Sequence, residues 1–430
     1  MLHCQYDKFQ KGRGTRVKTV SICGIGFMKR FTALLTCVIL LIGLAACHKQ
    51  KPEPSDPDNS EFTNTDPSGK VEDTKPVPVG YNLDEFDEAL ISYLCLNGYD
   101  SSNFLVSPAA FRTVLCLAAS GAQGNTRTEL VSAAGFSGMS SFDAWYSRLK
   151  RSTVFSVANS VWCDSGQLGG FTDSFISNLK RNYGANAYAY SSDTLTQAIH
   201  DWIHQKTDGA IPVIAENVAG ASSVLVSTLP LQAAWENMFP GDTTHEGTFV
   251  DWSGTKHTVD FMEQTTKYLY AEDGGTKVLV IPMDGNLSFV CFLGARAGRF
   301  DKMAGLQEKT VHVVLPKFSL TSAFNATDLL GFLLSRGVND AIDPRSANFY
   351  NMCKDADWFI QEILQKNSIT VGEEGVGPIT SSTKADPAGS VDEADIKEFI
   401  ADQSFSFAIF SDFGLGSQNM LFYGQLMTVE

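Results

Sequence analysis

The sequence lacks the features that several function classes require. Beyond Cys47 the cysteines are odd in number and include no C-x-x-C pair, so neither a disulfide framework nor a zinc knuckle is indicated, and buried free thiols are expected. No G-x-S-x-G elbow, phosphate-binding P-loop or strand-linked G-x-G-x-x-G motif is present, and no cofactor is expected. The cysteines concerned are Cys95, Cys116, Cys163, Cys291 and Cys353.

Basic residues are also scarce. The chain has 33 Lys and Arg against 48 Asp and Glu, which gives a formal net charge of −15. Binding to nucleic acid needs a basic face, and binding to anionic lipid through charge needs one too, so neither is expected. At 43% hydrophobic and 19% charged residues, the chain nevertheless has the composition of a folded protein with a large core.

The N-terminal residues have the pattern of a secretory signal. Met28-Lys29-Arg30 is a short positive start, and the apolar run 31–43 is too short for a comfortable membrane span. Leu44-Ala45-Ala46-Cys47 resembles the bacterial lipobox, in which the cysteine thiol receives diacylglycerol. This resemblance implies lipid attachment at Cys47, whereas the alternative is an ordinary signal peptide with a chance cysteine. The expected divisions are a mis-assigned extension over 1–27, a signal peptide over 28–46 and a lipidated tether over 47–80.

The tether is expected to be extended and disordered. It is rich in Pro, Asp, Glu and Ser and has Phe62 as its one aromatic residue before Gly80, so it cannot bury enough apolar area to offset its ordering entropy. Removal of residues 1–46 takes away seven bases and one acid and leaves a charge of −21. The expected product is a monomeric lipoprotein of the cell envelope, anchored in the outer membrane or at the cell surface.

Residues 81–430 show no internal repeat and are expected to form one domain. Ser107 and Pro108 predict an N-cap and a first-turn proline, and Thr126 with Glu129 has the spacing of a capping box. Helices are expected at the apolar stripe Leu83, Phe86, Leu90, Ile91 and Leu94, from Ser107 to Gly121, after Thr126, and from Asp193 to Lys206. Strands are expected at residues 154–162, 224–235, 277–283, 287–293, 311–320, 359–371, 405–410 and 420–426. Helices followed mostly by strands favour an α+β fold with large, mostly antiparallel sheets.

Several segments of this region resemble the serpin family, in the order and spacing of that family. They are Asn103-Phe104-Leu105-Val106-Ser107-Pro108, Gly121-Ala122-Gln123-Gly124-Asn125-Thr126, Ala158-Asn159-Ser160-Val161-Trp162, Trp202 with Thr207, Gly209 and Ile211, Leu225 and Val226 with Trp235 and Phe239, Leu315-Pro316-Lys317-Phe318, and Ala347-Asn348-Phe349. Glu373-Glu374-Gly375 resembles the hinge of a serpin reactive-centre loop, and residues 399–405 resemble the segment that returns from that loop.

The resemblance implies an inhibitor of extracellular serine or cysteine proteases, and no enzyme. In the family, a protease attacks a bait bond in an exposed loop and forms an acyl-enzyme. The cut loop then inserts into the central sheet as a new strand and deforms the protease. The hinge would comprise Glu373, Glu374, Gly375, Val376, Gly377 and Pro378, and the bait bond would be Gly389–Ser390 or Ser390–Val391.

Insertion requires every second loop side chain to enter the core. In the usual family register the inward set contains Pro378, Lys384 and Asp386, which fit a central strand poorly because proline lacks a donor and the charges would be buried. The opposite set contains Gly377 and Ile379 and is small or neutral. Our hypothesis is a bulge near Gly377-Pro378 that turns Ile379 inward. The inward set in the usual register is Val376, Pro378, Thr380, Ser382, Lys384 and Asp386.

Two other function classes are alternatives to protease inhibition. The first alternative is a non-inhibitory serpin-fold binding or scaffold protein whose loop is only a protease substrate. A distant one is a metalloenzyme, because residues 200–204, His-Asp-Trp-Ile-His, resemble H-E-x-x-H with a shorter general base, although no third ligand stands out and no metal is expected. Trp162, Trp202 and Trp235 are interpreted as core residues. Asn103 and Ser107 are expected to hold backbone groups near the opening of the central sheet.

Overall fold

The computed structural model describes residues 84–211, 218, 220–294, 300–354, 357–377, 395–412 and 418–429. These residues lie in one of two units of the chain, the unit Asp73–Glu430, and the other unit is Met1–Glu72. The α-helices are α1 (Glu85–Leu94), α2 (Pro108–Gly121), α3 (Gly124–Ala133), α4 (Met139–Leu149), α5 (Ser165–Leu168), α6 (Asp173–Asn178), α7 (Ser192–Lys206) and α8 (Ala326–Ser335).

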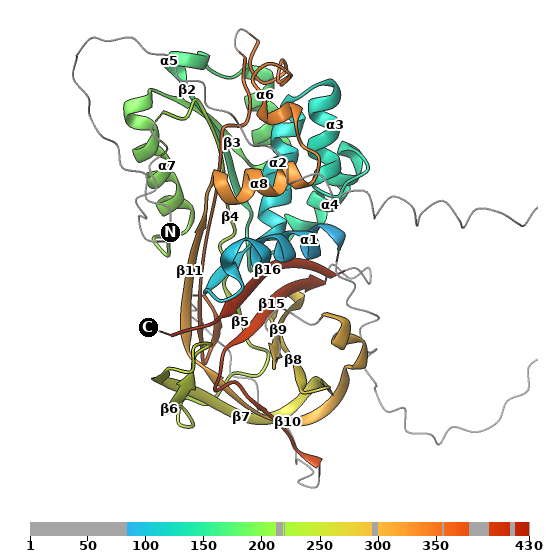
Figure 1. The fold of residues 1–430 in the computed structure, drawn as a ribbon, viewed down its shortest axis with the longest axis vertical. Coiled ribbons are helices and arrows are strands. Elements are labelled where there is room, and N and C mark those ends of the chain that lie inside the picture. Colours follow the sequence, from blue (N-terminus) through green and yellow to red (C-terminus); the bar gives the residue numbers. More distant parts are fainter. Residues whose placement is uncertain are drawn as a thin grey trace, which may run out of the picture. The chain divides into compact units, whose positions relative to one another are not determined.

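The described strands form two sheets (Figure 1). The seven-stranded sheet contains, in spatial order, β3 (Asn186–Tyr190), β2 (Ala158–Asp164), β4 (Ser223–Thr228), β12 (Glu362–Gly372), β13 (Gly375–Val376) and β5 (Ala233–Ala234), with β11 (Phe318–Phe324) on the other side of β12. The nine-stranded sheet contains, in spatial order, β1 (Phe104–Val106), β16 (Gln418–Leu426), β15 (Phe405–Asp412), β9 (Leu287–Leu293), β8 (Thr276–Met283), β7 (Lys256–Asp273), β10 (Gln307–Pro316) and β14 (Lys397–Ile400), with β6 (His245–Val250) beside β7. Most pairings are antiparallel, so the α+β prediction is confirmed.

The two faces of the seven-stranded sheet pack against different helices. On one face, alternate residues such as Trp162, Val224 and Leu364 pack with Leu195 and Trp202 of α7 in a small core. Side chains on the opposite face join the main core, which contains nearly all of α2 and much of the nine-stranded sheet. In Figure 1, α7 accordingly lies on one side of β2 and β4, and α2 lies on the other. The sheet is therefore a central layer between helices.

Several expected elements agree with the structure. The Ser107 side chain accepts a hydrogen bond from the backbone N–H of Ala110, with Pro108 in the first turn of α2. The helix expected to end at Lys206 is α7, and the strand expected at 287–293 is β9. Trp162, Trp202 and Trp235 are buried, as expected for core residues.

The expected capping box at Thr126 is wrong. The helix begins at Gly124, and Thr126 accepts a hydrogen bond from the backbone N–H of Asn348. Glu129 accepts hydrogen bonds from the backbone N–H groups of Asn339 and Ala341. Both side chains therefore bind a segment more than 200 residues away in the sequence instead of their own helix.

The strand expected at 311–320 is two strands. The chain passes from β10 in one sheet to β11 in the other at Lys317, whose backbone N–H donates to the carbonyl of Asp260 in β7. The longest strand, β7, was not predicted. It pairs with β6 near Lys256, with β10 along its middle and with β8 near Asp273, so no single face is buried along its length and no regular alternation marks it.

The cysteine prediction is confirmed for the described residues. All five cysteines beyond Cys47 are free thiols; four are buried and Cys95 is half-buried. Burial raises the pKa of the Cys163 thiol to about 12, so this group is a poor nucleophile at neutral pH. None of the helices in the described ranges is long and apolar enough to cross a membrane.

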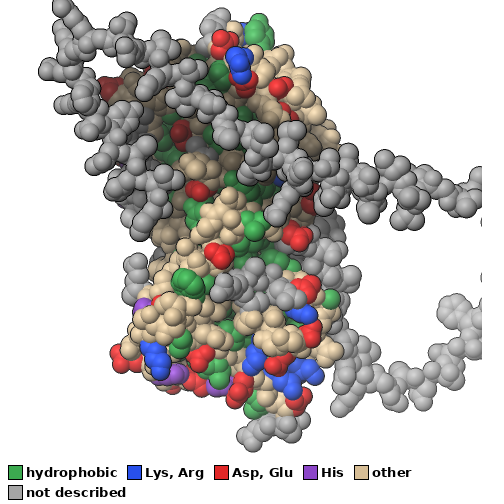
Figure 2. Space-filling model, viewed as in Figure 1, with side chains coloured by type: hydrophobic (Ala, Val, Ile, Leu, Met, Phe, Trp, Pro, Cys, Tyr) green, Lys and Arg blue, Asp and Glu red, His purple; other side chains and the backbone are tan. Residues whose placement is uncertain are grey.

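Surface charges of both signs are mixed on the face shown in Figure 2. On the nine-stranded sheet, Lys267 of β7 pairs with Glu308 of β10 at 3.3 Å, and Lys302 pairs with Asp273 of β7. The basic side chains on this face are thus interspersed with acidic ones.

A buried ion cluster joins α1 to α2. Arg112 of α2 bonds to Asp87 at 2.7 Å and to Asp84 at 2.6 Å, and its guanidinium lies 4.5 Å from the ring centroid of Phe86. Burial raises the pKa of the Asp87 carboxyl to about 6, although the Arg112 charge acts in the opposite direction. For Asp84, burial would raise the pKa, but Arg112 outweighs it and the pKa lies below its ordinary value.

The raised pKa of Asp87 predicts a pH-dependent contribution to stability. Relative to its ordinary value of 3.8, a folded-state pKa of about 6 means that the folded chain retains a proton that the unfolded chain has lost. The stabilising contribution of this group is therefore complete below about pH 4 and is lost as the pH rises through about 6. Asp87→Asn removes this titration. The melting temperature of the natural chain relative to the variant should fall between about pH 4 and pH 7.

The matched control for this experiment is Glu88→Gln, which changes an exposed carboxyl in the same helix. Its melting temperature relative to the natural chain should show no such change with pH. If the melting temperatures of the natural chain and Asp87→Asn differed by the same amount at about pH 4 and about pH 7, the raised pKa assigned to Asp87 would be contradicted.

Candidate functional site

The predicted hinge lies inside the seven-stranded sheet. After β12 the chain turns at Glu373 and Glu374 and returns as β13, which pairs antiparallel with β12 through Val371↔Val376 and Gly372↔Gly375. On its other side β13 pairs with β5, through Gly375↔Ala234 and Val376↔Ala233. Two of the described hinge residues, Gly375 and Val376, are therefore already a short strand of the sheet.

Backbone hydrogen bonds fix the turn of the hinge. The indole Nε1 of Trp235 donates to the carbonyl of Gly372 at 2.8 Å, and the backbone N–H of Trp235 donates to the carbonyl of Glu374 at 3.0 Å. The backbone N–H of Phe239 donates to the Glu373 carbonyl at 3.0 Å. Trp235 is held in turn by edge-to-face contacts with Phe239 and Phe289. Three successive carbonyls of the turn are thus bound by one rigid aromatic segment.

The Glu373 side chain is paired at the same place. Its carboxylate lies 2.9 Å from Lys317 Nζ and accepts a hydrogen bond from the Thr244 hydroxyl at 3.0 Å. Partial burial would raise the pKa of Glu373, but the bonds from Lys317 and Thr244 outweigh it, and the pKa lies below its ordinary value. Lys317 is the residue at which the chain changes sheets, so this pair couples the hinge to the junction of β10 and β11.

The end of the hinge is packed tightly. Val376 is completely buried, and the backbone N–H of Gly377 donates to the carbonyl of Thr370 at 2.8 Å. Gly377 has a φ of +95°, and a Cβ added to it would lie 2.2 Å from the carbonyl oxygen of Leu231. Both the left-handed backbone and the close approach require glycine here. The strand β13 therefore ends at Val376, and Gly377 follows it with a left-handed backbone.

A groove continues from Gly377 between two strands of the sheet. β4 and β12 pair in parallel only from Glu362↔Val224 to Gln365↔Ser227. Beyond that point, residues 228–232 and 368–370 line a cavity of about 370 Å³ together with Gly377 and residues 207–211, which follow α7. The groove has the position and the direction that a longer β13 would occupy.

Buried polar groups of β12, next to the residues that line the groove, connect the sheet to the start of α2. The Gln365 side chain accepts a hydrogen bond from the backbone N–H of Ser107 at 2.8 Å and donates to the Ser107 carbonyl at 2.9 Å. Asn367 donates to the Leu105 carbonyl at 3.1 Å. The backbone of Ser107 is therefore held by Gln365 of the sheet, whereas the Ser107 hydroxyl binds backbone groups of Ala110 and Leu421. The buried Asn159 side chain has no hydrogen-bond partner among the described residues.

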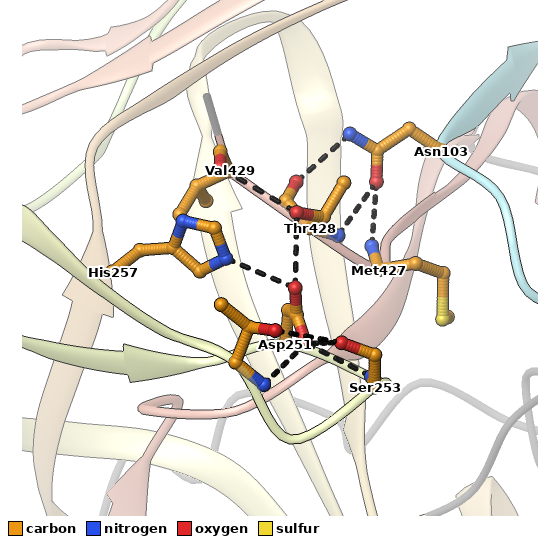
Figure 3. A network of polar contacts seen from close by, with 8 residues as sticks. Asn103, Asp251, Ser253, His257, Met427, Thr428 and Val429 are labelled. Atoms are coloured by element: carbon orange, nitrogen blue, oxygen red, sulfur yellow. Dashed lines mark hydrogen bonds and ion pairs between the residues drawn. The ribbon is translucent and has the colours of Figure 1, made fainter.

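The Asn103 side chain binds the backbone of the segment that follows β16. Its side-chain oxygen accepts hydrogen bonds from the backbone N–H groups of Met427 and Thr428, and its nitrogen donates to the Thr428 carbonyl (Figure 3). The expected role is confirmed, because Asn103 holds backbone groups, but these follow β16 of the nine-stranded sheet and do not belong to the seven-stranded sheet.

The C-terminal segment held by Asn103 is also tied to the turn between β6 and β7. Asp251 accepts hydrogen bonds from Ser253, from His257 Nε2 at 2.9 Å and from the Thr428 hydroxyl at 3.4 Å (Figure 3). The bond from His257, followed by those from Ser253, holds the pKa of the Asp251 carboxyl well below its usual range. This network fastens Thr428 to the turn between β6 and β7.

The motif at 200–204 does not assemble a metal site among the described residues. Asp201 accepts a hydrogen bond from Gln197 on the same helix, and His204 packs near Gly209. In the part of the chain that the structure describes, no three His, Cys, Asp or Glu side chains are grouped so that they could hold a metal ion.

Several predicted site residues lie outside the described residues. They are the hinge residue Pro378, the bait-bond residues Gly389, Ser390 and Val391, and the lipid-attachment residue Cys47. The structure adds hinge contacts that the sequence reasoning missed, from Trp235, Phe239, Lys317 and Thr244. Three of these belong to segments that carry the family resemblance, whereas Thr244 has no sequence signal because its role depends on how β6 lies beside the hinge.

Comparison with known families gives one match across the region. The family model "Serpin (serine protease inhibitor)" matches residues 86–429. Among similar proteins, the leukocyte elastase inhibitor of Sus scrofa is 26% identical over 365 residues, which cover 76% of this chain and 93% of that protein. An uncharacterized serpin-like protein of Thermococcus kodakarensis is 23% identical over 437 residues, which cover 93% of this chain and 99% of that protein.

Solved structures share the fold. Human thyroxine-binding globulin in complex with thyroxine has a TM-score of 0.68 at 19% identity, over 80% of this chain and 97% of that chain. A highly specific serpin of the insect Tenebrio molitor has a TM-score of 0.67 at 24% identity, over 84% of this chain and 100% of that chain. At these identities the likeness concerns the fold alone.

The packing at Gly377 predicts that this glycine holds the end of the hinge. Gly377→Ala would meet the Leu231 carbonyl in a backbone conformation that costs about 1–3 kcal/mol. We expect a lower melting temperature and faster proteolytic cleavage immediately after the hinge. The matched control is Gly372→Ala in the same hairpin, where an added Cβ has no neighbour within 4 Å. Equal behaviour of the two variants would contradict the role assigned to Gly377.

Proposed function

This chain belongs to the serpin family, and from that premise we propose that it inhibits extracellular serine or cysteine proteases as a suicide bait. Members of the family are generally protease inhibitors and not enzymes, and no catalytic residue is assigned here. The observation that carries the proposal is the short strand β13, paired on both sides in the sheet and followed by an open groove.

The groove supplies a physical reason for insertion. Beyond Gln365↔Ser227 the ladder between β4 and β12 stops, although both chains continue along the groove. A strand entering there would gain ladder hydrogen bonds and core contacts that the intact chain leaves unmade. We propose that cleavage of the loop after Pro378 frees this segment to extend β13 into the groove, and that the gain in stability draws the attached protease along.

The proposed bait bond is Gly389–Ser390 or Ser390–Val391. Small neutral residues at both positions suit elastase-like or subtilisin-like proteases better than trypsin-like ones, which need a basic residue. The similarity to leukocyte elastase inhibitors supports the same class. Downstream, Asp392 and Glu393 would repel an acidic protease.

The register of insertion is the difficult step. If alternation continued regularly from the buried Val376, Lys384 and Asp386 would enter the core, at a cost of several kcal/mol for each uncompensated charge. The positive φ at Gly377 interrupts the alternation at the first residue of the groove. We propose that this irregular residue shifts the register by one, so that Ile379 turns inward and the charges stay in solvent.

Inhibition predicts a covalent complex. The full chain mixed with pancreatic elastase or subtilisin should give an SDS-stable adduct, and trypsin should give less of it. Because an arginine cannot be buried at an inward position, Ile379→Arg should convert the inhibitor into a substrate, whereas the matched variant Thr380→Arg should still form the adduct. Cleavage near Ser390 without any adduct from the natural chain would instead favour the non-inhibitory binding or scaffold protein.

If Ile379→Arg still formed the adduct and Thr380→Arg did not, the inhibitory function would stand, but the proposed register shift would be overturned. The melting temperature of the cleaved chain gives a second readout, because insertion raises it. An unchanged melting temperature after cleavage would exclude loop insertion.

We also propose that the domain is held at the cell envelope by a diacylglycerol group on Cys47. The support is the apolar run before Leu44-Ala45-Ala46-Cys47 and the proline-rich stretch that follows. A tether of this composition would hold an acidic domain away from the anionic membrane surface. The bait loop would then meet proteases from outside the cell.

The anchor predicts labelling at one cysteine. The natural chain, expressed in a bacterium fed with radioactive palmitate, should carry label and sediment with membranes. Cys47→Ser should lose the label and the sedimentation, whereas the matched control Cys37→Ser, in the apolar run, should retain both. Label that persists in Cys47→Ser would contradict the attachment site.

A further inference from the structure

A second groove lies on the seven-stranded sheet, away from the hinge. It measures about 560 Å³, within the size range of small-ligand sites, and runs between α7 and the edge strand β3. Aromatic side chains from the strands and from α7 line one part, namely Trp162, Tyr188, Tyr190 and Trp202. A stripe of α7 lines the other part, namely Thr194, Gln197, Ala198, Asp201 and Gln205.

The aromatic residues form one continuous floor. The Trp162 ring lies 4.5 Å from Tyr188 and 5.7 Å from Tyr190, measured between ring centroids, with interplanar angles of 33° and 40°. Trp202 packs edge-on against Trp162 at 6.3 Å. The two tryptophans are buried, whereas Tyr190 is 39% exposed and Tyr188 is half-buried. The tyrosines thus offer ring surface to a ligand and the tryptophans hold them in place.

The wall opposite this floor is polar and uncharged or acidic. Gln197, Asp201 and Gln205 recur at helical spacing on one exposed stripe of α7. The Gln197 amide donates to the Asp201 carboxylate at 2.8 Å, which orients both groups. The lining includes no Lys, Arg or His, so a phosphate, a sulfate or an acidic sugar would find no counter-charge.

We propose that this groove binds a neutral oligosaccharide. A pyranose ring has an apolar C–H face that packs on a tyrosine ring, and hydroxyl groups at its rim that donate to a carboxylate and exchange hydrogen bonds with amides. The tyrosine floor supplies the first requirement, and Gln197, Asp201 and Gln205 supply the second. Binding here would attach the domain to a glycan surface without using the hinge or the bait loop, and it does not depend on protease inhibition.

Binding is tested by titrating the full chain with cellotetraose, chitotetraose and mannotetraose. Tryptophan fluorescence reports on Trp162 and Trp202 at the floor, and calorimetry gives the affinity. At least one of the three should bind with a Kd of about 10 mM or tighter. Tyr190→Ala and Asp201→Asn should each weaken that binding by about tenfold or more, because they remove the stacking surface and the charged acceptor.

The matched control is Tyr350→Ala, which removes a 53% exposed tyrosine outside the groove lining and should bind like the natural chain. Circular dichroism at the titration temperature verifies that each variant is folded. The proposal is overturned if none of the three sugars binds at about 10 mM, or if folded Tyr190→Ala and Asp201→Asn bind like the natural chain. The protease assay is run separately, so its failure leaves this result unaffected.

Discussion

The hydrogen bonds that hold the hinge turn to Trp235 and Phe239 are the constraint on which the proposed mechanism depends. They bind three successive carbonyls, from Gly372 to Glu374, and so fix where β12 ends and where β13 enters the sheet. The Glu373–Lys317 pair adds a charge-assisted contact at the same turn. Because the turn is fixed, any extension of β13 is directed into the groove between β4 and β12, and not over the surface.

In the seven-stranded sheet, β4 and β12 pair in one part and are separated by the groove in another. The closed part runs from Glu362 to Gln365 of β12, which pair with β4, and Gln365 bonds to Ser107, the N-cap of α2. Beyond Gln365 the ladder between β4 and β12 stops, and the two residues of β13 pair with β12 and β5. Buried side chains of β12 and backbone groups before α2 satisfy each other in the closed part. The α7 helix bounds one groove with its exposed stripe, and residues 207–211, which follow α7, line the other.

Much of the fold followed from local patterns, and the failures have physical causes. The cap at Ser107, the strand at 287–293 and the buried tryptophans depend on short-range rules, and these were confirmed. Thr126 and Glu129 had the spacing of a cap, but distant backbone donors near Asn348 and Asn339 compete for both side chains. The β7 strand exchanges partners along its length, so the alternation used to recognise strands was absent.

The sequence by itself determined the family, the α+β class and the free thiols, because motif order, periodicity and residue chemistry are local properties. Only the tertiary structure decided that Val376 is already in the sheet, that Gly377 interrupts the strand, and that Lys317 and Thr244 bind the hinge. It also brought the aromatic residues of β2, β3 and α7 to one groove. These facts depend on which segments become neighbours, and that is set by the packing of the whole core.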